Sequence, residues 1–346
     1  MDFRKYNSIE NSYRQLEIDT IRQYGYADGL WVVTEKIHGS NLSFAINGDE
    51  EIKVSKRSGW IELLSSFFRA DTVYAKYEER IKDLYEIVTC DEKLDDAEVE
   101  CIQLYGEIYG GYYPHEDVER CKDAKKVQQG VLYCPHNDFY PFDIYVRKAD
   151  GKSYPLDHDV FERVMEEAGF TIYAKALFTG TFDECLAYQN EYPTTISKLH
   201  GLPDLDDNIC EGNVLKPVKA MCKPSGSRVI LKNKNDRFKE KEASKKVKVA
   251  KEISPEVQEA INIAAGYITE NRLRNVLSHI GSVSQKEFGK VIGAFSQDVL
   301  ADFEKENADL LKDFERDELN TVNKSVGKES ANLIRANFLN IIDGNF

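Results

Sequence analysis

The sequence predicts an α+β first part with antiparallel sheets, followed by a small all-α C-terminal domain. Three observations predict this division. Strand-like and helix-like segments in the first two-thirds do not follow a strict βαβ alternation, which disfavours a doubly wound parallel sheet. A densely charged stretch covers residues 236–252, and only helical periodicity follows it. A chain of 346 residues also has the length of two domains.

The expected strands of the first part are short β-branched and aromatic runs bounded by Gly, Asn or Pro. They cover residues 30–36, 41–46, 102–109, 138–146, 211–217 and 228–235. Two segments between them, 73–88 and 159–169, repeat apolar residues at helical spacing and predict helices.

The C-terminal part carries recognisable helix boundaries. Ser254 is an expected N-cap with Pro255 at the first helical position and an acidic residue behind it. Gly281 is expected to end a helix, and Ser284 with Glu287 has the spacing of a capping box. The tail from about residue 302 reads as charged helix. We therefore expect a domain over residues 1–243, a linker at 244–253 and a helical domain at 254–346.

Composition excludes several classes of protein. The chain is 42% hydrophobic and 11% aromatic, which argues against general disorder. No run of about 18 apolar residues predicts a membrane span, and the polar N-terminus lacks a signal-peptide pattern. An intracellular, cytoplasmic location is the expectation. The seven cysteines have no zinc-knuckle or redox spacing, so reduced thiols are the simplest interpretation.

Charge is distributed unevenly along the chain. The net charge is −14, yet residues 215–251 carry 13 Lys or Arg and only three acids. A local basic stretch can bind polyphosphate even in an acidic protein, because phosphate contacts are local. Taken alone, the stretch is equally well explained as a solvated, charge-rich linker.

One lysine has unusual neighbours. Lys36 ends a predicted strand and is followed by Ile37-His38-Gly39-Ser40-Asn41, a turn that brings short polar side chains and backbone amides near its amine. Further along the chain lie the phrases Lys56-Arg57-Ser58-Gly59, Tyr105-Gly106-Glu107, Phe142-Asp143, Glu211-Gly212-Asn213-Val214-Leu215-Lys216 and Leu231-Lys232-Asn233-Lys234. Lys232 and Lys234 alternate on one strand and so face the same side.

In this order and spacing, the motifs resemble the covalent nucleotidyltransferase superfamily, and within it the RNA ligase 2 family of phage double-strand RNA ligases and kinetoplastid editing ligases. The helical phrases YITENRLRNVLSHIG and KEFGKVIGAFSQDVL match as well. The resemblance covers about Tyr6 to about Leu300. DNA ligases and capping enzymes typically place Asp two residues after the nucleophilic Lys, whereas this chain has His38, as the RNA ligase 2 branch does.

The resemblance implies a nucleotidyltransferase fold and a role for each motif in ATP chemistry. Lys36 would attack the α-phosphorus of ATP and hold AMP covalently, so the site must favour its unprotonated amine over the ammonium form expected at an ordinary pKa near ~10.4. Lys232 and Lys234 would offset phosphate charge. Glu211 would bind Mg²⁺ or Mn²⁺, both hard cations. Nucleotide contacts would come from Glu35, Ile37, Arg57, Glu107 on the ribose and Phe142 on the adenine.

The resemblance also implies contacts to nucleic acid. Asn41 and Arg57 would act on the nick and its 5′-phosphate, for which a guanidinium is well suited. Ser40, Phe67 and Phe68 would contact the 3′-end of the acceptor strand. Two adjacent phenylalanines in a helical stretch are more often core residues.

The predicted function is ATP-dependent sealing of 3′-hydroxyl/5′-phosphate nicks in duplex RNA, with RNA on the 3′-hydroxyl side, by a monomeric enzyme. A DNA ligase or capping guanylyltransferase is the alternative within the superfamily. A non-catalytic RNA-binding protein and, more remotely, a Schiff-base lysine enzyme are the alternatives outside it. We expect removal of residues after about 250 to spare lysyl-AMP formation and to impair joining.

Overall fold

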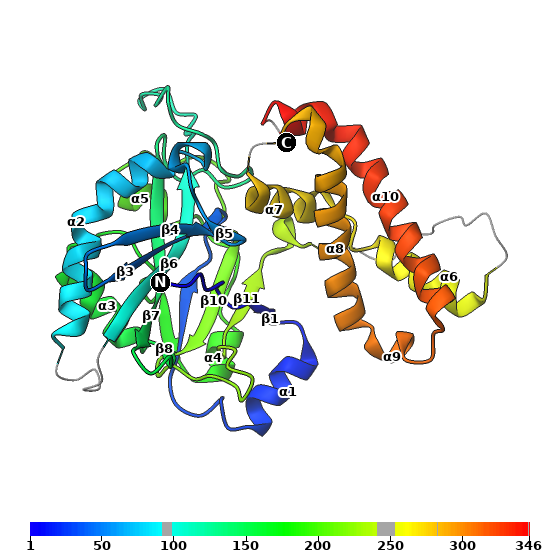
Figure 1. Cartoon of the computed structure of the whole chain (residues 1–346), viewed down its shortest axis with the longest axis horizontal. Coiled ribbons are helices and arrows are strands. Elements are labelled where there is room, and N and C mark those ends of the chain that lie inside the picture. The colour runs from blue at the N-terminus through cyan, green and yellow to red at the C-terminus, as the bar shows by residue number, and fades with distance from the viewer. Residues whose placement is uncertain (92–98, 241–252, 282, 345) are drawn as a thin grey trace. The chain divides into compact units, whose positions relative to one another are not determined.

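The computed structural model describes residues 1–91, 99–240, 253–281, 283–344 and 346 (Figure 1). Contacts between residues divide the chain into two compact units, Met1–Arg237 and Phe238–Phe346. The predicted boundary at 243 and the linker 244–253 fall largely on residues 241–252, outside the described residues, and stay a prediction. None of the described helices is long and apolar enough to cross a membrane.

The first unit contains a five-stranded sheet in the order β1-β11-β10-β2-β9. Its strands are β1 (Glu10–Asn11), β2 (Trp31–Glu35), β9 (Phe178–Gly180), β10 (Gly212–Pro217) and β11 (Leu231–Lys234). All neighbours are antiparallel except β1 and β11. Helices α1 (Gln15–Gln23) and α4 (Phe182–Leu186) cover one face through a core that includes Ile21, Trp31 and Leu231.

A six-stranded antiparallel sheet in the order β5-β4-β3-β6-β7-β8 forms the rest of the first unit. Its strands are β3 (Ser40–Asn47), β4 (Ile52–Lys56), β5 (Gly59–Trp60), β6 (Val99–Gly110), β7 (Asn137–Lys148) and β8 (Ser153–Pro155). The helices packed on this sheet are α2 (Ala70–Thr89) and α3 (His158–Glu167), with the short η1 (Leu64–Ser66) before α2. A four-residue helix, α5 (Ile196–Leu199), follows later.

The second unit is helical throughout the part that the structure describes. It contains α6 (Pro255–Ala265), α7 (Glu270–Ile280), η3 (Gln285–Glu287), α8 (Phe288–Glu306), α9 (Ala308–Leu311) and α10 (Arg316–Ile342), after η2 (Asp236–Phe238) at the junction. Its core includes Leu273, Phe295 and Ile334. The buried residues of this core all come from the second unit itself.

Most predicted elements are confirmed. Every expected strand and both expected helices of the first unit are present, with ends shifted by a few residues. The Ser254 N-cap accepts from the Val257 amide, Gly281 ends α7 with a positive φ, and Ser284 and Glu287 form the expected capping box. The fold class is therefore the α+β arrangement that the sequence predicts, with antiparallel pairing in all but one strand pair.

Candidate functional site

The centre of the candidate site is the end of β2. The Lys36 amide donates to the Gly212 carbonyl at 2.9 Å, which extends the β2–β10 pairing by one residue and fixes where the side chain leaves the sheet. Its Nζ then lies 2.6 Å from Oε2 of Glu211, and the Lys36 side chain is 19% exposed. The amine is thus held at a fixed place yet remains reachable from solvent.

Glu211 gathers three basic groups from separate strands and turns. Its side chain is 1% exposed, its Oε1 lies 2.8 Å from Lys234 Nζ, and its Oε2 lies 3.6 Å from His38 Nδ1. Burial by itself raises the pKa of Glu211, but attraction to Lys234, Lys36 and His38 outweighs it and holds the pKa well below the usual range. Glu211 is therefore an ionised carboxylate inside the protein.

The turn after Lys36 requires a glycine at position 39. A Cβ on Gly39 would lie 2.5 Å from the Ile108 carbonyl oxygen and 3.2 Å from the Glu107 Cβ. Because no side chain fits in that space, β3 can begin beside β6 directly after the turn. The turn is further tied down by the His38 amide, which donates to the Tyr133 hydroxyl at 2.8 Å, and by Gln128, which donates to the Gly39 carbonyl.

Glu107 faces the same space from β6. It pairs in register with Asn41 of β3. Burial raises the pKa of Glu107 to about 8, with the negative charge of Glu211 adding to the effect and the cations Lys36, Arg57 and Lys234 opposing it. These electrostatic neighbours place Glu107 in one cluster with the residues around Lys36. A carboxyl group with this pKa is mostly neutral at pH 7 and can both donate and accept hydrogen bonds.

Phe142 is partly exposed, and the residue that follows it, Asp143, is held in place by buried contacts. Asp143 is fully buried, accepts from the Tyr6 hydroxyl at 2.8 Å, and forms an ion pair with the buried Arg228. Lys216 donates to the Phe142 carbonyl at 2.9 Å, and burial lowers the pKa of Lys216 to about 8. The Tyr6 ring meets the Phe142 ring edge-on, with centroids 4.9 Å apart.

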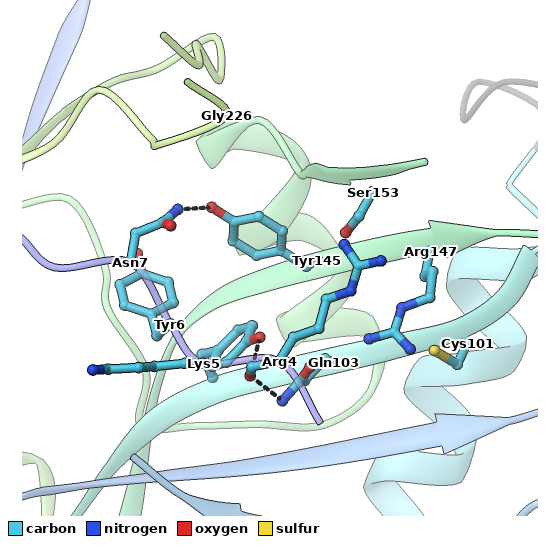
Figure 2. A pocket seen from close by; sticks show the side chains of 11 residues that line it. Arg4, Lys5, Tyr6, Asn7, Cys101, Gln103, Tyr145, Arg147, Ser153 and Gly226 are labelled. Carbon is cyan, nitrogen blue, oxygen red and sulfur yellow. Dashed lines mark hydrogen bonds between the residues drawn. The ribbon is translucent and has the colours of Figure 1, made fainter. Parts of the chain in front are cut away.

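The N-terminal segment that carries Tyr6 runs along β6 and β7 and lines a pocket of about 420 Å³ (Figure 2). The Arg4 carbonyl accepts from Gln103 and from the Tyr105 hydroxyl, and Asn7 donates to the Tyr145 hydroxyl. These bonds hold residues 4–7 in place. The segment therefore fixes Tyr6 behind Phe142, a contribution that no sequence motif indicated.

Glu35 and Ile37, which flank Lys36, are both buried. The Glu35 carboxylate accepts from Thr194 and Thr195, with Thr195 donating through both its amide at 2.9 Å and its hydroxyl at 2.6 Å. Burial raises the pKa of Glu35, and these hydrogen bonds act in the opposite direction. The side chain thus serves the local structure, while its carbonyl accepts from Tyr140 at 3.5 Å.

The predicted nucleic-acid residues are placed unevenly. Arg57 is near the surface and donates to the Ser8 hydroxyl, and Phe68 is partly exposed. Ser40 is 1% exposed and Phe67 is 3% exposed. Both side chains are buried in this structure, and their contacts with an acceptor strand stay a prediction. Phe67 packs as a core residue, with Lys56 above its ring at 5.5 Å.

The remaining predicted residues are Asn41 and Lys232. Asn41 is 7% exposed and its amide donates to the Gly106 carbonyl at 3.3 Å. Lys232 lies two residues before Lys234 on β11, so both side chains leave the same face of the strand. Sequence reasoning missed Tyr6, Tyr133 and the pair Thr194–Thr195, which contact the motif residues from distant segments.

The arrangement suits transfer of a phosphorylated group to an amine. A buried anion, a second lysine, Lys234, and the Arg57 guanidinium lie in one electrostatic cluster with the reachable Lys36 nitrogen, so an incoming anionic ligand would find positive charge already in place. A divalent hard cation also fits, because Glu211 supplies ionised carboxylate oxygens in the same space. Residue types and charges both agree with the predicted chemistry.

Comparison with protein families gives two matches. Residues 29–234 match the RNA ligase family, and residues 250–332 match the C-terminal region of T4 RNA ligase 2. The two matches together cover most of the chain, and the first alone covers more than half of it.

Curated relatives and a solved structure are also similar to this chain. The chain is 27% identical to mitochondrial RNA-editing ligase 2 of Trypanosoma brucei brucei, over 88% of this chain and 83% of that protein. It is 29% identical to mitochondrial RNA-editing ligase 1, over 88% and 76%. A mutant Naegleria gruberi RNA ligase solved with ATP and Mn is similar, with a TM-score of 0.44 and 18% identity over 69% of this chain. This chain spans 58% of the length of the Naegleria chain.

Proposed function

Since the chain belongs to the RNA ligase family, and to its RNA ligase 2 branch, we propose that it joins RNA ends with ATP through a covalent lysyl-AMP on Lys36. The observation that carries this proposal is the convergence at Glu211. Lys36, at 2.6 Å, and Lys234, at 2.8 Å, share one buried carboxylate, with Glu107 and Arg57 in the same electrostatic cluster.

In the first step, Lys36 Nζ forms a bond to the α-phosphorus of ATP. The bond from that phosphorus to the bridging oxygen breaks, pyrophosphate leaves, and the amine loses a proton. Lys234 and Lys232 supply positive charge where negative charge builds on the phosphate oxygens. Glu211 would hold Mg²⁺ or Mn²⁺, which when bound supplies charge stabilisation to the phosphates.

The nucleotide contacts follow from the side chains around Lys36. Phe142 offers a partly exposed aromatic face, held from behind by Tyr6, for adenine. Glu107, mostly neutral at pH 7, can donate to one ribose hydroxyl and accept from another. The Glu35 carbonyl and Ile37 would border the adenine edge.

In the later steps, AMP passes from Lys36 to a 5′-phosphate, and a 3′-hydroxyl then attacks that phosphate and releases AMP. Arg57 is the guanidinium for the 5′-phosphate, with Asn41 beside it and Phe68 as the remaining aromatic contact. Positioning and charge stabilisation account for most of the protein's part in such reactions.

We further propose that the substrate is nicked duplex RNA with RNA on the 3′-hydroxyl side, and that the enzyme acts as an intracellular monomer. The helical unit, residues 254–346, would contact the duplex backbone. Its independent core supports a role separate from the adenylation chemistry. A chain ending after about residue 250 should therefore form lysyl-AMP and fail to join a nick.

The deciding experiment is incubation with α-labelled ATP and Mg²⁺. The wild type should become labelled, and Lys36→Ala and Lys36→Arg should not. Lys36→Arg keeps a cation opposite Glu211, so loss of label there shows that the nucleophile and not the charge is missing. Lys53→Ala, an exposed lysine on β4, is the matched control and should label normally. Label that persists in both Lys36 variants would remove this residue from the mechanism, and label from GTP would favour a capping enzyme.

A further inference from the structure

A second group of chemically reactive side chains lies in the first unit, apart from the Lys36 cluster. Cys134 and His136 lie immediately before β7, and His200 lies immediately after α5. One ligand atom from each residue, a sulfur and two imidazole nitrogens, lies within 4.8 Å of the other two. The three residues are brought together by the fold, since His200 is far from the other two in sequence.

A carboxylate lies beside the two imidazoles of this group. Asp138 Oδ2 lies 3.6 Å from Nε2 of His136 and 3.7 Å from Nε2 of His200. The carboxylate is fully buried and its Oδ1 accepts from the Tyr77 hydroxyl at 2.8 Å, which fixes its orientation. One sulfur and two nitrogens therefore face one another, and the Asp138 oxygen lies beside the two imidazoles.

We propose that Cys134, His136 and His200 bind a zinc ion, with the neighbouring Asp138 turning towards the ion as the fourth ligand. Zinc takes four ligands of these types in a tetrahedron, with bonds of about 2.3 Å to sulfur and about 2.0–2.1 Å to nitrogen. In such a tetrahedron the sulfur and nitrogen ligands lie about 3.3–3.6 Å apart. The two oxygen-to-nitrogen distances are already close to that spacing. A soft thiolate together with imidazoles selects zinc over magnesium.

Binding requires small local exchanges. The Cys134 thiol, which donates to the His136 carbonyl at 3.1 Å, would lose its proton and form a sulfur–zinc bond, so one proton is released for each ion bound. Lys76 Nζ lies 2.8 Å from Asp138 Oδ2, but its side chain is 43% exposed and can turn into solvent. His136 is 42% exposed and gives the ion a way in.

The position of the cluster indicates what the ion would do. Tyr133, next to Cys134, accepts from the His38 amide beside the proposed nucleophile. Thr194 and Thr195, just before α5, bind the Glu35 carboxylate. A zinc ion joining the residues before β7 to the end of α5 would therefore brace both supports of the Lys36 strand. This is a structural role, distinct from the divalent cation at Glu211.

Another arrangement of the same residues needs no metal. His200 Nε2 shares a hydrogen bond with the Tyr109 hydroxyl at 2.9 Å, and both imidazoles lie near the Asp138 carboxylate. Such a network would hold the same segments without an ion. It would not, however, bind cobalt through sulfur, and this difference makes the two arrangements separable.

The test uses the full-length chain, stripped of metal with a chelator and then dialysed against Zn²⁺ or Co²⁺. We expect one zinc per chain by elemental mass spectrometry, and for Co²⁺ visible d–d bands with a sulfur-to-cobalt charge-transfer band. Cys134→Ser should lose the charge-transfer band, and His200→Gln should weaken Zn²⁺ binding at least ~10-fold. Zn²⁺ should raise the melting temperature of the wild type and leave that of Cys134→Ser unchanged.

Cys185→Ser is the matched control, because Cys185 is buried in the same unit outside the cluster; it should bind Co²⁺ as the wild type does. Wild-type protein that retains no zinc, or a cobalt complex without the sulfur band, would overturn the proposal. The wild-type measurements stand even if a variant fails to fold. Metal content is also measured without ATP or RNA, so this result is independent of whether Lys36 is adenylated.

Discussion

Replacing Glu107 with glutamine is expected to stabilise the first unit while impairing its reaction with ATP. Burial raises the pKa of the Glu107 carboxyl to about 8 from an ordinary 4.5. A carboxyl whose pKa is raised by folding contributes full stability only below pH 4.5, and that stability is lost as pH rises towards 8, because the unfolded chain ionises first. Glu107→Gln removes this dependence while keeping size and hydrogen-bonding capacity.

The size of the effect follows from the two pKa values. With 1.36 kcal/mol per pKa unit, the ionisable group costs the folded state about 3 kcal/mol at pH 7 and about 5 kcal/mol at pH 9. These are upper limits, because Glu107 is partly exposed and solvent screens part of the charge. We therefore expect Glu107→Gln to raise the free energy of unfolding by about 1–3 kcal/mol at pH 7, and by more at pH 9.

The assay is urea unfolding followed by tryptophan fluorescence at pH 6, 7, 8 and 9. Both tryptophans, Trp31 and Trp60, lie in the first unit, so the signal reports on that unit alone. Glu100→Gln, an exposed glutamate on the same strand, is the control and should change stability little. The variant should also need more ATP for half-maximal labelling, since an amide cannot replace the carboxyl on the ribose equally well. A gain that does not grow with pH, or that equals the control's, would refute the reasoning.

Three further predictions concern other residues. Glu211→Gln leaves two lysines facing each other without an anion, so ATP labelling should fall at least ~100-fold and stability by about 3–5 kcal/mol, read by labelling and urea unfolding. Gly39→Ala places a methyl group 2.5 Å from the Ile108 carbonyl and should abolish labelling while circular dichroism still shows a folded chain. Arg228→Met leaves the buried Asp143 carboxylate without its guanidinium partner and should lower the free energy of unfolding by about 3–5 kcal/mol. A loss under about 1 kcal/mol would show that another group compensates the Asp143 charge.

Local patterns in the sequence predicted the elements of the fold well. The alternation around residues 30–36 and the helical spacing of 73–88 depend on near neighbours, and both became β2 and α2. The caps at Ser254 and Ser284 are also local, because a side chain and an amide three residues apart form them. Strand order and the parallel β1–β11 pair were not predictable, because they depend on contacts between distant segments.

The site was predictable to the extent that motifs carry it. Lys36, Glu211 and Lys234 were expected to lie close together, and both lysines form ion pairs with the Glu211 carboxylate. Phe67 is buried, and its predicted contact with RNA stays untested, since a phenylalanine that stacks on a ligand and one that fills the core look alike in sequence. The residues that support the motifs came from segments with no motif at all. Tyr6 donates to Asp143, which lies 137 residues further along the chain. No pattern in the residues around Tyr6 predicts such a contact.

The same limit explains why the cysteines suggested no metal site. Zinc motifs are found in sequence when ligands lie close together on a short loop. Here Cys134, His136 and Asp138 are close together in sequence, but His200 is added only by folding, after β7, α3 and α4 have intervened. The spacing of the cysteines in the sequence therefore predicts reduced thiols and no metal site. What indicates a metal site is the proximity of an imidazole to a thiol in three dimensions, and only the fold shows this proximity.

The contacts of the Glu211 carboxylate suggest how Lys36 can be held near the nucleotide and still leave its ion pair. While it is paired with Glu211, the Lys36 amine is directed at the carboxylate and not at a phosphorus atom. If Lys36 were the only partner, its departure would leave a buried anion unpaired, at a cost of several kcal/mol. Lys234 lies 2.8 Å from the other carboxylate oxygen and His38 lies nearby, so Glu211 stays compensated when Lys36 turns to the nucleotide. We therefore propose that Lys234 serves as the counter-ion that lets the proposed nucleophile leave Glu211. Its replacement by methionine should slow adenylation more than the loss of one phosphate contact would explain, and an effect confined to ATP affinity would count against this role.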